Sequence, residues 1–215
     1  MREILLTIGI PSIPSRMRMN LEPMFSKIMA QIGSRKDIEV VSILDNRSIT
    51  IGKKRHMLHR LAQGKYCAII DDDDDIASNY VDEVYAAIKE HDGVDVIHYN
   101  QEAIFDGVSF LVVTDITAPR DPFEQMPRTP KDQNGNWIPV RRPPWHWCAW
   151  RTEFARQYPF GDSNSGEDTM FVSSAVPNIK SHYKIEKVLH TYKFSSASTS
   201  APLIPGNINK PVVMT

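Results

Sequence analysis

The 215-residue chain has few cysteines and no long apolar run. Its two cysteines, Cys67 and Cys148, cannot build a disulfide framework, and no spacing of cysteine and histidine matches a zinc site. No stretch approaches the roughly 18 consecutive apolar residues that a membrane span requires. The N-terminal apolar run is too short, and its flanking charge wrong, for a signal peptide. These absences predict a soluble protein of a reducing compartment, the cytoplasm.

An excess of charge of either sign is also missing. Lys plus Arg is 25 and Asp plus Glu is 26, which gives a net charge of −1. Because duplex nucleic acid is bound by basic surfaces, we expect no such partner, although a local basic patch can still hold a small phosphorylated ligand. The apolar fraction of 41% and the charged fraction of 24% are those of an ordinary globular protein. The length suits one domain.

Short apolar runs alternate with helical patterns in the first hundred residues. The runs at 4–10, 38–44, 66–70 and 94–98 predict strands, and helices are predicted over 21–32 and 56–63 and from residue 78 onward. Continuous rather than alternating apolar strands favour an α/β fold with a mostly parallel central sheet flanked by helices. Ligands of such sheets bind at the carboxyl ends of the strands.

The second half has a different pattern. Residues 104–116 predict one or two strands, and residues 182–194 predict a strand pair. All 4 tryptophans lie between Trp137 and Trp150. Trp147 and Trp150 are expected in the core, whereas Trp137 and Trp145 are candidates either for the core or for a platform that stacks on sugars. Residues 195–215 predict a loose tail, or a linker to further C-terminal domains.

Five consecutive aspartates, Asp71 to Asp75, follow the predicted strand at 66–70. Surface runs of like charge are usually solvated, but a buried strand delivers this one to the sheet edge. Strand alternation predicts Asp71 and Asp73 on one side and Asp72 on the other. Two carboxylates on one side can share a hard cation, and ligation by oxygen alone favours Mg²⁺ or Mn²⁺ over zinc.

Other phosphate-binding motifs are absent. Around Gly52 and Lys53 the earlier glycine of a P-loop is missing, and Lys54 replaces its hydroxyl residue. The segment 9–12 does not supply the glycines of a dinucleotide site. Haloacid-dehalogenase-like phosphatases carry their acidic motif after the first strand, with Thr or Val at the fifth position, where this chain has Asp75 after the third strand.

One ordered set of motifs spans roughly residues 4–193. In sequence it comprises Ile8-Gly9-Ile10-Pro11-Ser12, Asp45-Asn46, Gly52-Lys53-Lys54-Arg55, Gly64-Lys65-Tyr66 leading into the aspartates, Asn79-Tyr80, and Gly166-Glu167-Asp168. This set resembles the GT-A glycosyltransferases of the family-2 type. The compact form is similar to glycosyltransferase domains encoded by phages and large DNA viruses, such as the first domain of a chlorella-virus glycosylation protein. A viral origin would put the protein in the host cytoplasm.

The resemblance implies a Rossmann-like nucleotide-diphospho-sugar transferase fold. A single domain would span 1–194, with residues 1–100 binding the nucleotide sugar and residues 101–194 binding the acceptor. It also implies a UDP-sugar donor, transferred as a hexose or deoxyhexose to a glycan or another hydroxyl acceptor.

Roles at the donor site follow from the same resemblance. The loop of Pro11 and Ser12 would pass under the nucleoside, and Asp45 would accept a hydrogen bond from the uracil imide. Arg55, with Lys53 nearby, would face the base or the diphosphate. The resemblance further implies that Asp71 and Asp72 contact the nucleotide, with Asp71 on the ribose side. The implied ligands of Mn²⁺ or Mg²⁺ are Asp73, Asp71 and His190.

The Glu167-Asp168 pair has two interpretations. The resemblance makes Asp168 the general base of an inverting transferase, with Glu167 beside it; the simpler interpretation is N-terminal helix capping. A helix start would lower the pKa of Asp168 and keep it ionised. Trp145 and His146 are the candidate acceptor residues. Two alternatives stay open, a nucleotidyltransferase of related fold and a non-catalytic carbohydrate-binding module.

Overall fold

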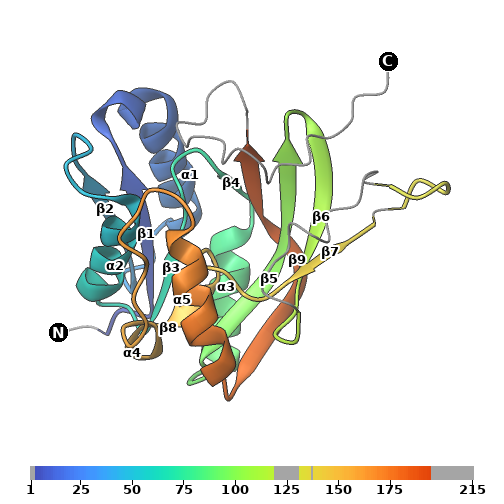
Figure 1. The fold of residues 1–215 in the computed structure, drawn as a ribbon. Coiled ribbons are helices and arrows are strands. Elements are labelled where there is room, and N and C mark those ends of the chain that lie inside the picture. The colour runs from blue at the N-terminus through green and yellow to red at the C-terminus, as the bar shows by residue number, and fades with distance from the viewer. Residues whose placement is uncertain (1–2, 119–130, 137, 195–215) are drawn as a thin grey trace.

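The computed structural model describes residues 3–118, 131–136 and 138–194 (Figure 1). These residues form a nine-stranded sheet in the order β2-β1-β3-β8-β5-β6-β7, while β9 pairs with β5 and β4. The strands are β1 (Leu6–Ser12), β2 (Ile38–Leu44), β3 (Tyr66–Ile69), β4 (Asp75–Ile76), β5 (Val96–Phe105), β6 (Val108–Thr114), β7 (Val140–Arg142), β8 (Ala149–Arg151) and β9 (His182–Phe194). The α-helices are α1 (Glu22–Ile32), α2 (Ile51–Leu61), α3 (Tyr80–Glu90), α4 (Thr152–Ala155) and α5 (Glu167–Ala175).

The first half of the sheet is parallel, as predicted. β1 lies between β2 and β3 and runs parallel to both. Every residue of β1 is buried, because helices cover both faces of the sheet here. α1 packs against α3, and α2 packs against β1 and α5. The predicted α/β architecture with a central sheet flanked by helices is confirmed.

The second half makes the sheet mixed. β8 is antiparallel to β3 and β5, and β6 is antiparallel to β5, whereas β9 runs parallel to β5. β5 and β6 form a tight hairpin, in which Asp106 and Gly107 both have positive φ, the geometry of a type I′ turn. β9 is one strand of 13 residues and not the predicted pair. Its register with β5 shifts after Tyr99, so the strand bulges without breaking.

Trp147 and Trp150 lie in the main hydrophobic core, as expected. Trp145 is also buried, with 5% of its surface exposed. Trp137 and the predicted tail, 195–215, lie outside the described residues. Within the described part of the chain, no helix is long and apolar enough to cross a membrane.

Candidate active site

The carboxyl ends of β1, β2 and β3 meet the first turns of α2 and α5 (Figure 1). α2 begins at Ile51, earlier than the predicted start at 56, because the Thr50 side chain caps the backbone N–H of Lys53. The extra turn holds Lys54 and Arg55, both buried. α5 begins at Glu167, directly after Gly166, whose backbone is left-handed, and no side chain caps the start of the helix.

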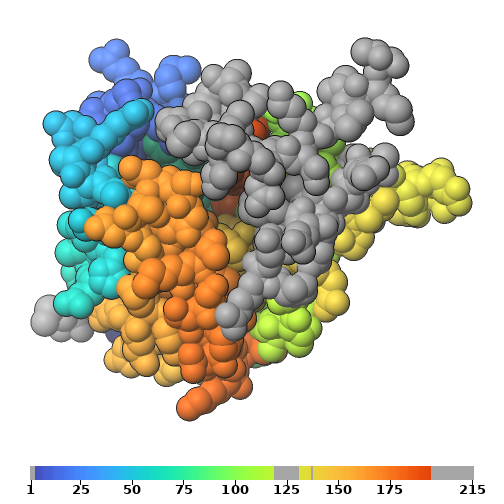
Figure 2. Space-filling view, viewed as in Figure 1, coloured from blue at the N-terminus to red at the C-terminus, as the bar shows by residue number. Residues whose placement is uncertain are grey.

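A close backbone approach joins α2 to the segment 161–167, which comprises the loop before α5 and the first residue of that helix. A Cβ on Gly52 would lie 1.8 Å from the carbonyl oxygen of Gly161 and 2.9 Å from Cβ of Glu167. The backbone N–H of Gly52 donates to Ser163 at 3.2 Å. Figure 2 shows this loop and α5 lying against the α2 segment at the surface. Only glycine at position 52 permits that distance, and the contact brings Arg55 to Glu167.

Arg55 is the centre of a buried cluster of charge. Its guanidinium hydrogen-bonds Asp71 through Nη2 and Glu167 through Nη1, and Nη1 lies 3.9 Å from Asp168 Oδ2. Three carboxylates therefore share one guanidinium, which we call the Arg55 cluster. The sequence predicted Arg55, Asp71, Glu167 and Asp168 as site residues, and the fold brings all four together.

The pKa values in the Arg55 cluster diverge. Burial raises the pKa of Glu167 to about 7, and the neighbouring charge of Asp168 adds to this. Burial also acts to raise the pKa of Asp168, but Arg55, His146 and a hydrogen bond from Trp145 outweigh it and bring the pKa below its ordinary value. Asp168 is thus ionised at neutral pH, and Glu167 is the more readily protonated carboxyl of the two.

Asp168 is oriented by an indole. Trp145 Nε1 donates to Asp168 Oδ2 at 2.7 Å. His146 lies between two carboxylates, with Nδ1 3.6 Å from Asp168 Oδ2 and Nε2 3.8 Å from Asp71 Oδ2. Burial lowers the pKa of His146, and Arg55 lowers it further. The predicted acceptor residues Trp145 and His146 thus lie against the predicted base.

The acidic run forms a turn and not an extension of the strand. β3 ends at Ile69, and the backbone N–H of Asp74 donates to the carbonyl of Asp71 at 3.2 Å. The predicted strand alternation was therefore wrong. Asp72 and Asp73 instead share Arg16, whose Nη1 lies 3.1 Å from Asp72 Oδ1 and 2.9 Å from Asp73 Oδ2. Asp71 alone turns to the Arg55 cluster.

Ser12 joins the end of β1 to this turn. Its hydroxyl donates to Asp72 Oδ2 at 2.5 Å, which fixes the buried Asp72 carboxylate. Pro11 and Ser12, predicted to form a loop under a nucleoside, still belong to β1 and pair with Ile43 and Leu44 of β2, so the loop itself begins only after Ser12.

The carboxylates of the acidic turn suit a hard cation that is coordinated partly by the protein and partly by a bound substrate. Burial raises the pKa of Asp73 to about 7, and the charges of Asp71, Asp74 and Asp72 contribute; a bound cation would relieve this repulsion. No three His, Cys, Asp or Glu side chains among the described residues gather as a complete metal site. Mg²⁺ is commonly held by one or two carboxylates together with substrate phosphates and water, and the half-buried Asp73 can supply such a ligand.

His190 lies apart from Asp71 and Asp73. Its Nδ1 is 2.8 Å from Gln101 Nε2, its Nε2 is 3.1 Å from Asp74 Oδ2, and its ring stacks on Trp147. Both imidazole nitrogens thus face protein groups, and a metal at His190 would have to displace Asp74.

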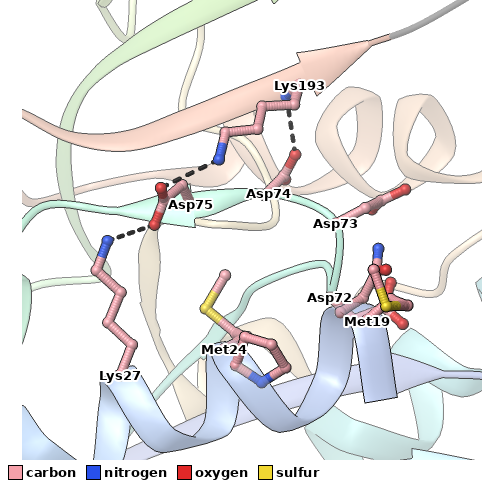
Figure 3. A pocket seen from close by; sticks show the side chains of 10 residues that line it. Met19, Met24, Lys27, Asp72, Asp73, Asp74, Asp75 and Lys193 are labelled. Carbon is pink, nitrogen blue, oxygen red and sulfur yellow. Dashed lines mark hydrogen bonds and ion pairs between the residues drawn. The ribbon is translucent and has the colours of Figure 1, made fainter. Parts of the chain in front are cut away.

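A pocket of about 330 Å³ lies beside the acidic turn (Figure 3). It is lined by Asp72 to Asp75, Met19, Asn20, Pro23, Met24, Lys27 and Lys193. Asp75 pairs with both lysines across it. The Arg55 cluster does not line this pocket, so the acidic turn separates two distinct environments.

Asp45 and Lys54 form a second buried ion pair at the end of β2. Lys54 Nζ pairs with Asp45 Oδ1 and donates to the carbonyl of Ser12 at 2.6 Å. Asp45 Oδ2 accepts bonds from Ser48 and Ile49, both at 2.9 Å. The hydrogen bond from Lys54 holds the pKa of Asp45 well below its usual range.

Lys53, which the sequence named for the donor site, is exposed and pairs with exposed Asp162 at 2.8 Å. Its neighbour Lys54, which the sequence did not name for that site, is buried and pairs with Asp45. The sequence analysis also did not name Arg16, which pairs with Asp72 and Asp73. Its position, a few residues after Pro11 and Ser12, was a signal that could have indicated it.

No model of a known protein family matches the chain, and no curated protein matches it in sequence. Solved structures match its fold. The crystal structure of Staphylococcus aureus TarS 1–349 in complex with UDP-GlcNAc gives a TM-score of 0.59 at 15% identity, over 93% of this chain and 62% of that one. The complex of the same protein with UDP gives 0.56 at 16%, over 89% and 60%.

The chain therefore spans about three fifths of TarS 1–349. With these neighbours the predicted GT-A fold is confirmed. Identity this low establishes the fold alone.

Proposed function

We propose that this chain is a glycosyltransferase that moves a sugar from a UDP-sugar to an acceptor hydroxyl. The observation that supports it most is the Arg55 cluster. One guanidinium joins Asp71, at the end of a central strand, to Glu167 and Asp168 at the start of α5. A donor-side and an acceptor-side carboxylate are thereby held together on a fold shared with a protein crystallised with UDP-GlcNAc.

In this proposal residues 1–100 hold the nucleotide and residues 101–194 hold the acceptor, within a single domain of 1–194. Asp45 is ionised and can accept a hydrogen bond from the uracil imide, and Lys54 keeps its carboxylate in place. Ser12 and Asp72 fix the loop beneath the nucleoside through their mutual hydrogen bond. Asp71, anchored by Arg55, faces the ribose side.

Asp168 is the proposed general base. Trp145 holds its Oδ2, so the carboxylate is oriented before an acceptor arrives. The acceptor hydroxyl gives its proton to Asp168 while its oxygen forms a bond to the anomeric carbon. In the same step the bond from that carbon to the diphosphate breaks, and its electron pair leaves on UDP. Attack from the face opposite the leaving group inverts the configuration.

Asp73 is the proposed ligand of Mn²⁺ or Mg²⁺, with Asp71 nearby. Such a cation, when bound, supplies Lewis-acid neutralisation of the charge that grows on the diphosphate. Arg16 already neutralises Asp72 and Asp73 in part, and it would have to move from Asp73 as the cation binds.

Two variants test these roles separately. Asp73→Ala should abolish Mn²⁺-dependent binding of UDP in calorimetry, and binding that is unchanged would refute the metal assignment. Asp168→Asn should keep UDP-sugar binding but lower transfer by about 10²- to 10⁴-fold, the usual contribution of a general base. Asp82→Asn, at an exposed position of α3, is the matched control and should leave both UDP binding and transfer unchanged. If transfer survives in Asp168→Asn, the base lies elsewhere.

The reaction products separate the alternatives. A nucleotidyltransferase releases pyrophosphate, whereas the proposed enzyme releases UDP. A carbohydrate-binding module would bind sugars without metal and would not hydrolyse the donor. A screen of sugar nucleotides for Mn²⁺-dependent thermal stabilisation would identify the sugar, because ligands that bind the folded state raise its stability. The hexose or deoxyhexose class of the sugar is the prediction that this screen tests. The likeness to virus-encoded domains stays a separate prediction.

A further inference from the structure

Arg142, the last residue of β7, stacks on the indole that orients the proposed base. Its Cζ lies 3.9 Å from the ring centroid of Trp145. Trp145 in turn donates to Asp168. A single indole therefore connects the guanidinium of Arg142 to the carboxylate that we assign as the base. Because β7 and Trp145 both belong to residues 101–194, Arg142 lies in the proposed acceptor half.

This guanidinium is short of partners. Among the described residues, no carboxylate lies within ion-pair distance of it, and its one side-chain hydrogen bond is a long one, from Nη1 to Gln101 Oε1 at 3.4 Å. Its Nε is buried without a partner. Burial lowers the pKa of Arg142 to about 10, because the distant charge of Asp168 does not offset the lost hydration. Buried charges are ordinarily paired.

The two neighbouring arginines of β7 differ sharply. Arg141 is exposed and pairs with Asp115. Arg142 is partly covered, and four of its five N–H donors have no acceptor among the described residues. Arg55, by contrast, has three carboxylates within 4 Å. Arg142 thus has binding capacity that the described residues do not use.

We propose that Arg142 binds an oxyanion, a phosphate or carboxylate group of the acceptor substrate, so that the acceptor is an anionic hydroxyl compound. This rests on the proposed transferase function and narrows its substrate class. The planar fork of a guanidinium matches both oxyanions through two parallel hydrogen bonds, whereas a neutral hydroxyl uses less of it. The nucleophilic hydroxyl and the anion would lie on one molecule that spans the edge of Trp145.

The donor diphosphate is the competing ligand for Arg142. It is disfavoured because Arg142 comes from β7 and contacts none of the acidic turn, which is neutralised by Arg16, Lys27 and Lys193. If Arg142 bound the diphosphate, its loss would weaken UDP binding. The acceptor proposal predicts instead that UDP affinity is unchanged.

The test follows the indole N–H signal of Trp145 by NMR in the full chain, assigned with Trp145→Phe and recorded with UDP present. The probes are inorganic phosphate, methyl glucoside 6-phosphate, methyl glucuronide and neutral methyl glucoside. We expect the anionic probes to shift the Trp145 signal saturably and the neutral glycoside to leave it unmoved. A phosphorylated glycoside that binds tighter than inorganic phosphate identifies an acceptor site; equal affinities would reduce the site to one for free anions and overturn the acceptor assignment.

Arg142→Gln should weaken the anionic probes about 10- to 100-fold, as expected for hydrogen bonds to a charged group. Arg142→Lys keeps the charge without the fork and should give an intermediate loss. Arg141→Gln is the matched control and should change nothing. No anion-dependent shift in the wild type, or equal affinities in wild type and Arg142→Gln, would overturn the proposal.

UDP affinity, measured by calorimetry on the same samples, distinguishes the two hypotheses. Weaker UDP binding in Arg142→Gln would assign the residue to the donor and refute the acceptor role. A wild type that binds the anionic probes but neither binds UDP nor releases it from UDP-sugars would refute the transferase and leave only an anion site.

Discussion

The Arg55 cluster and the acidic turn both gather aspartates at the same sheet edge, yet they balance charge in opposite ways. In the Arg55 cluster one cation, with 5% of its side chain exposed, holds three carboxylates. At the turn Arg16, Lys27 and Lys193 each come from a different element, and 32% to 49% of each side chain is exposed.

This difference separates a framework from a binding surface. A buried guanidinium cannot leave without stranding unpaired carboxylates, so Arg55 fixes the geometry of Asp71, Glu167 and Asp168. Exposed ion pairs contribute about 0–1 kcal/mol each and exchange with a ligand at little cost. We therefore propose the turn as the place where a cation and a diphosphate enter, and the Arg55 cluster as the framework that holds the proposed base, Asp168, in position.

Removal of Arg55 is expected to have the largest effect. Arg55→Met leaves three buried carboxylates without their cation and should cost about 3–5 kcal/mol of folding stability. Arg16→Met, the equivalent change at the turn, should cost less, about 1–2 kcal/mol, because Ser12 still binds the buried Asp72 carboxylate and Asp73 is partly exposed. Urea denaturation at pH 7.5 measures both.

The control for Arg55 is Arg60→Met, at an exposed position in the last turn of the same helix, which should stay within about 0.5 kcal/mol of wild type. The comparison fails if Arg16→Met and Arg55→Met destabilise the protein equally.

The approach of α2 to the segment 161–167 gives a second, smaller test. Ala at position 52 must displace the carbonyl of Gly161, so Gly52→Ala should destabilise the fold by about 1–3 kcal/mol, as overpacking does. It should also lower UDP-sugar turnover, because α2 carries Arg55 away from Glu167. Gly33→Ala is the control: its Cβ meets nothing within 4 Å, but φ is +60°. It should cost stability at α1 and leave turnover unchanged.

Much of the framework was predictable from the sequence. β1, β2 and α1 lie within two residues of their predicted bounds, because buried β-branched runs and helical apolar spacing are strong local signals. The position of the aspartates after a buried strand was equally readable. The start of α2 was not, because its first turn buries Lys54 and Arg55 through ion pairs, and apolar periodicity begins only after them.

Sequence patterns predict side-chain environment least well where two neighbouring residues are of the same type. Lys53 is exposed beside Asp162 while Lys54 is buried against Asp45. Arg141 and Arg142 differ in the same way. Residue type alone does not distinguish the members of each pair, because their roles depend on which carboxylate or indole the fold brings against each side chain. The β9 bulge was missed for a related reason: polar Glu186 and Lys187 interrupt the pattern but lie on a strand held by β5.

The smallest expected effect is a difference in pH-dependent stability between two carboxylates of the acidic turn, Asp73 and Asp75. Burial and like charge raise the pKa of Asp73 to about 7, so between about pH 4 and 7 the folded chain binds more protons than the unfolded one, and stability falls as pH rises. Asp73→Asn removes this cost and should stabilise the protein by about 1 kcal/mol at pH 8, a value kept small by solvent screening, with no gain near pH 4.

The pKa of Asp75 is shifted in the opposite direction, so its replacement should have the opposite effect on stability. Although burial raises its pKa, hydrogen bonds from Lys27 and Lys193 lower it overall, so Asp75→Asn should destabilise at pH 8. Melting temperatures from pH 4 to 8 decide the matter, and a loss of stability in both variants would mean that the turn is a fixed ion-pair network like the Arg55 cluster.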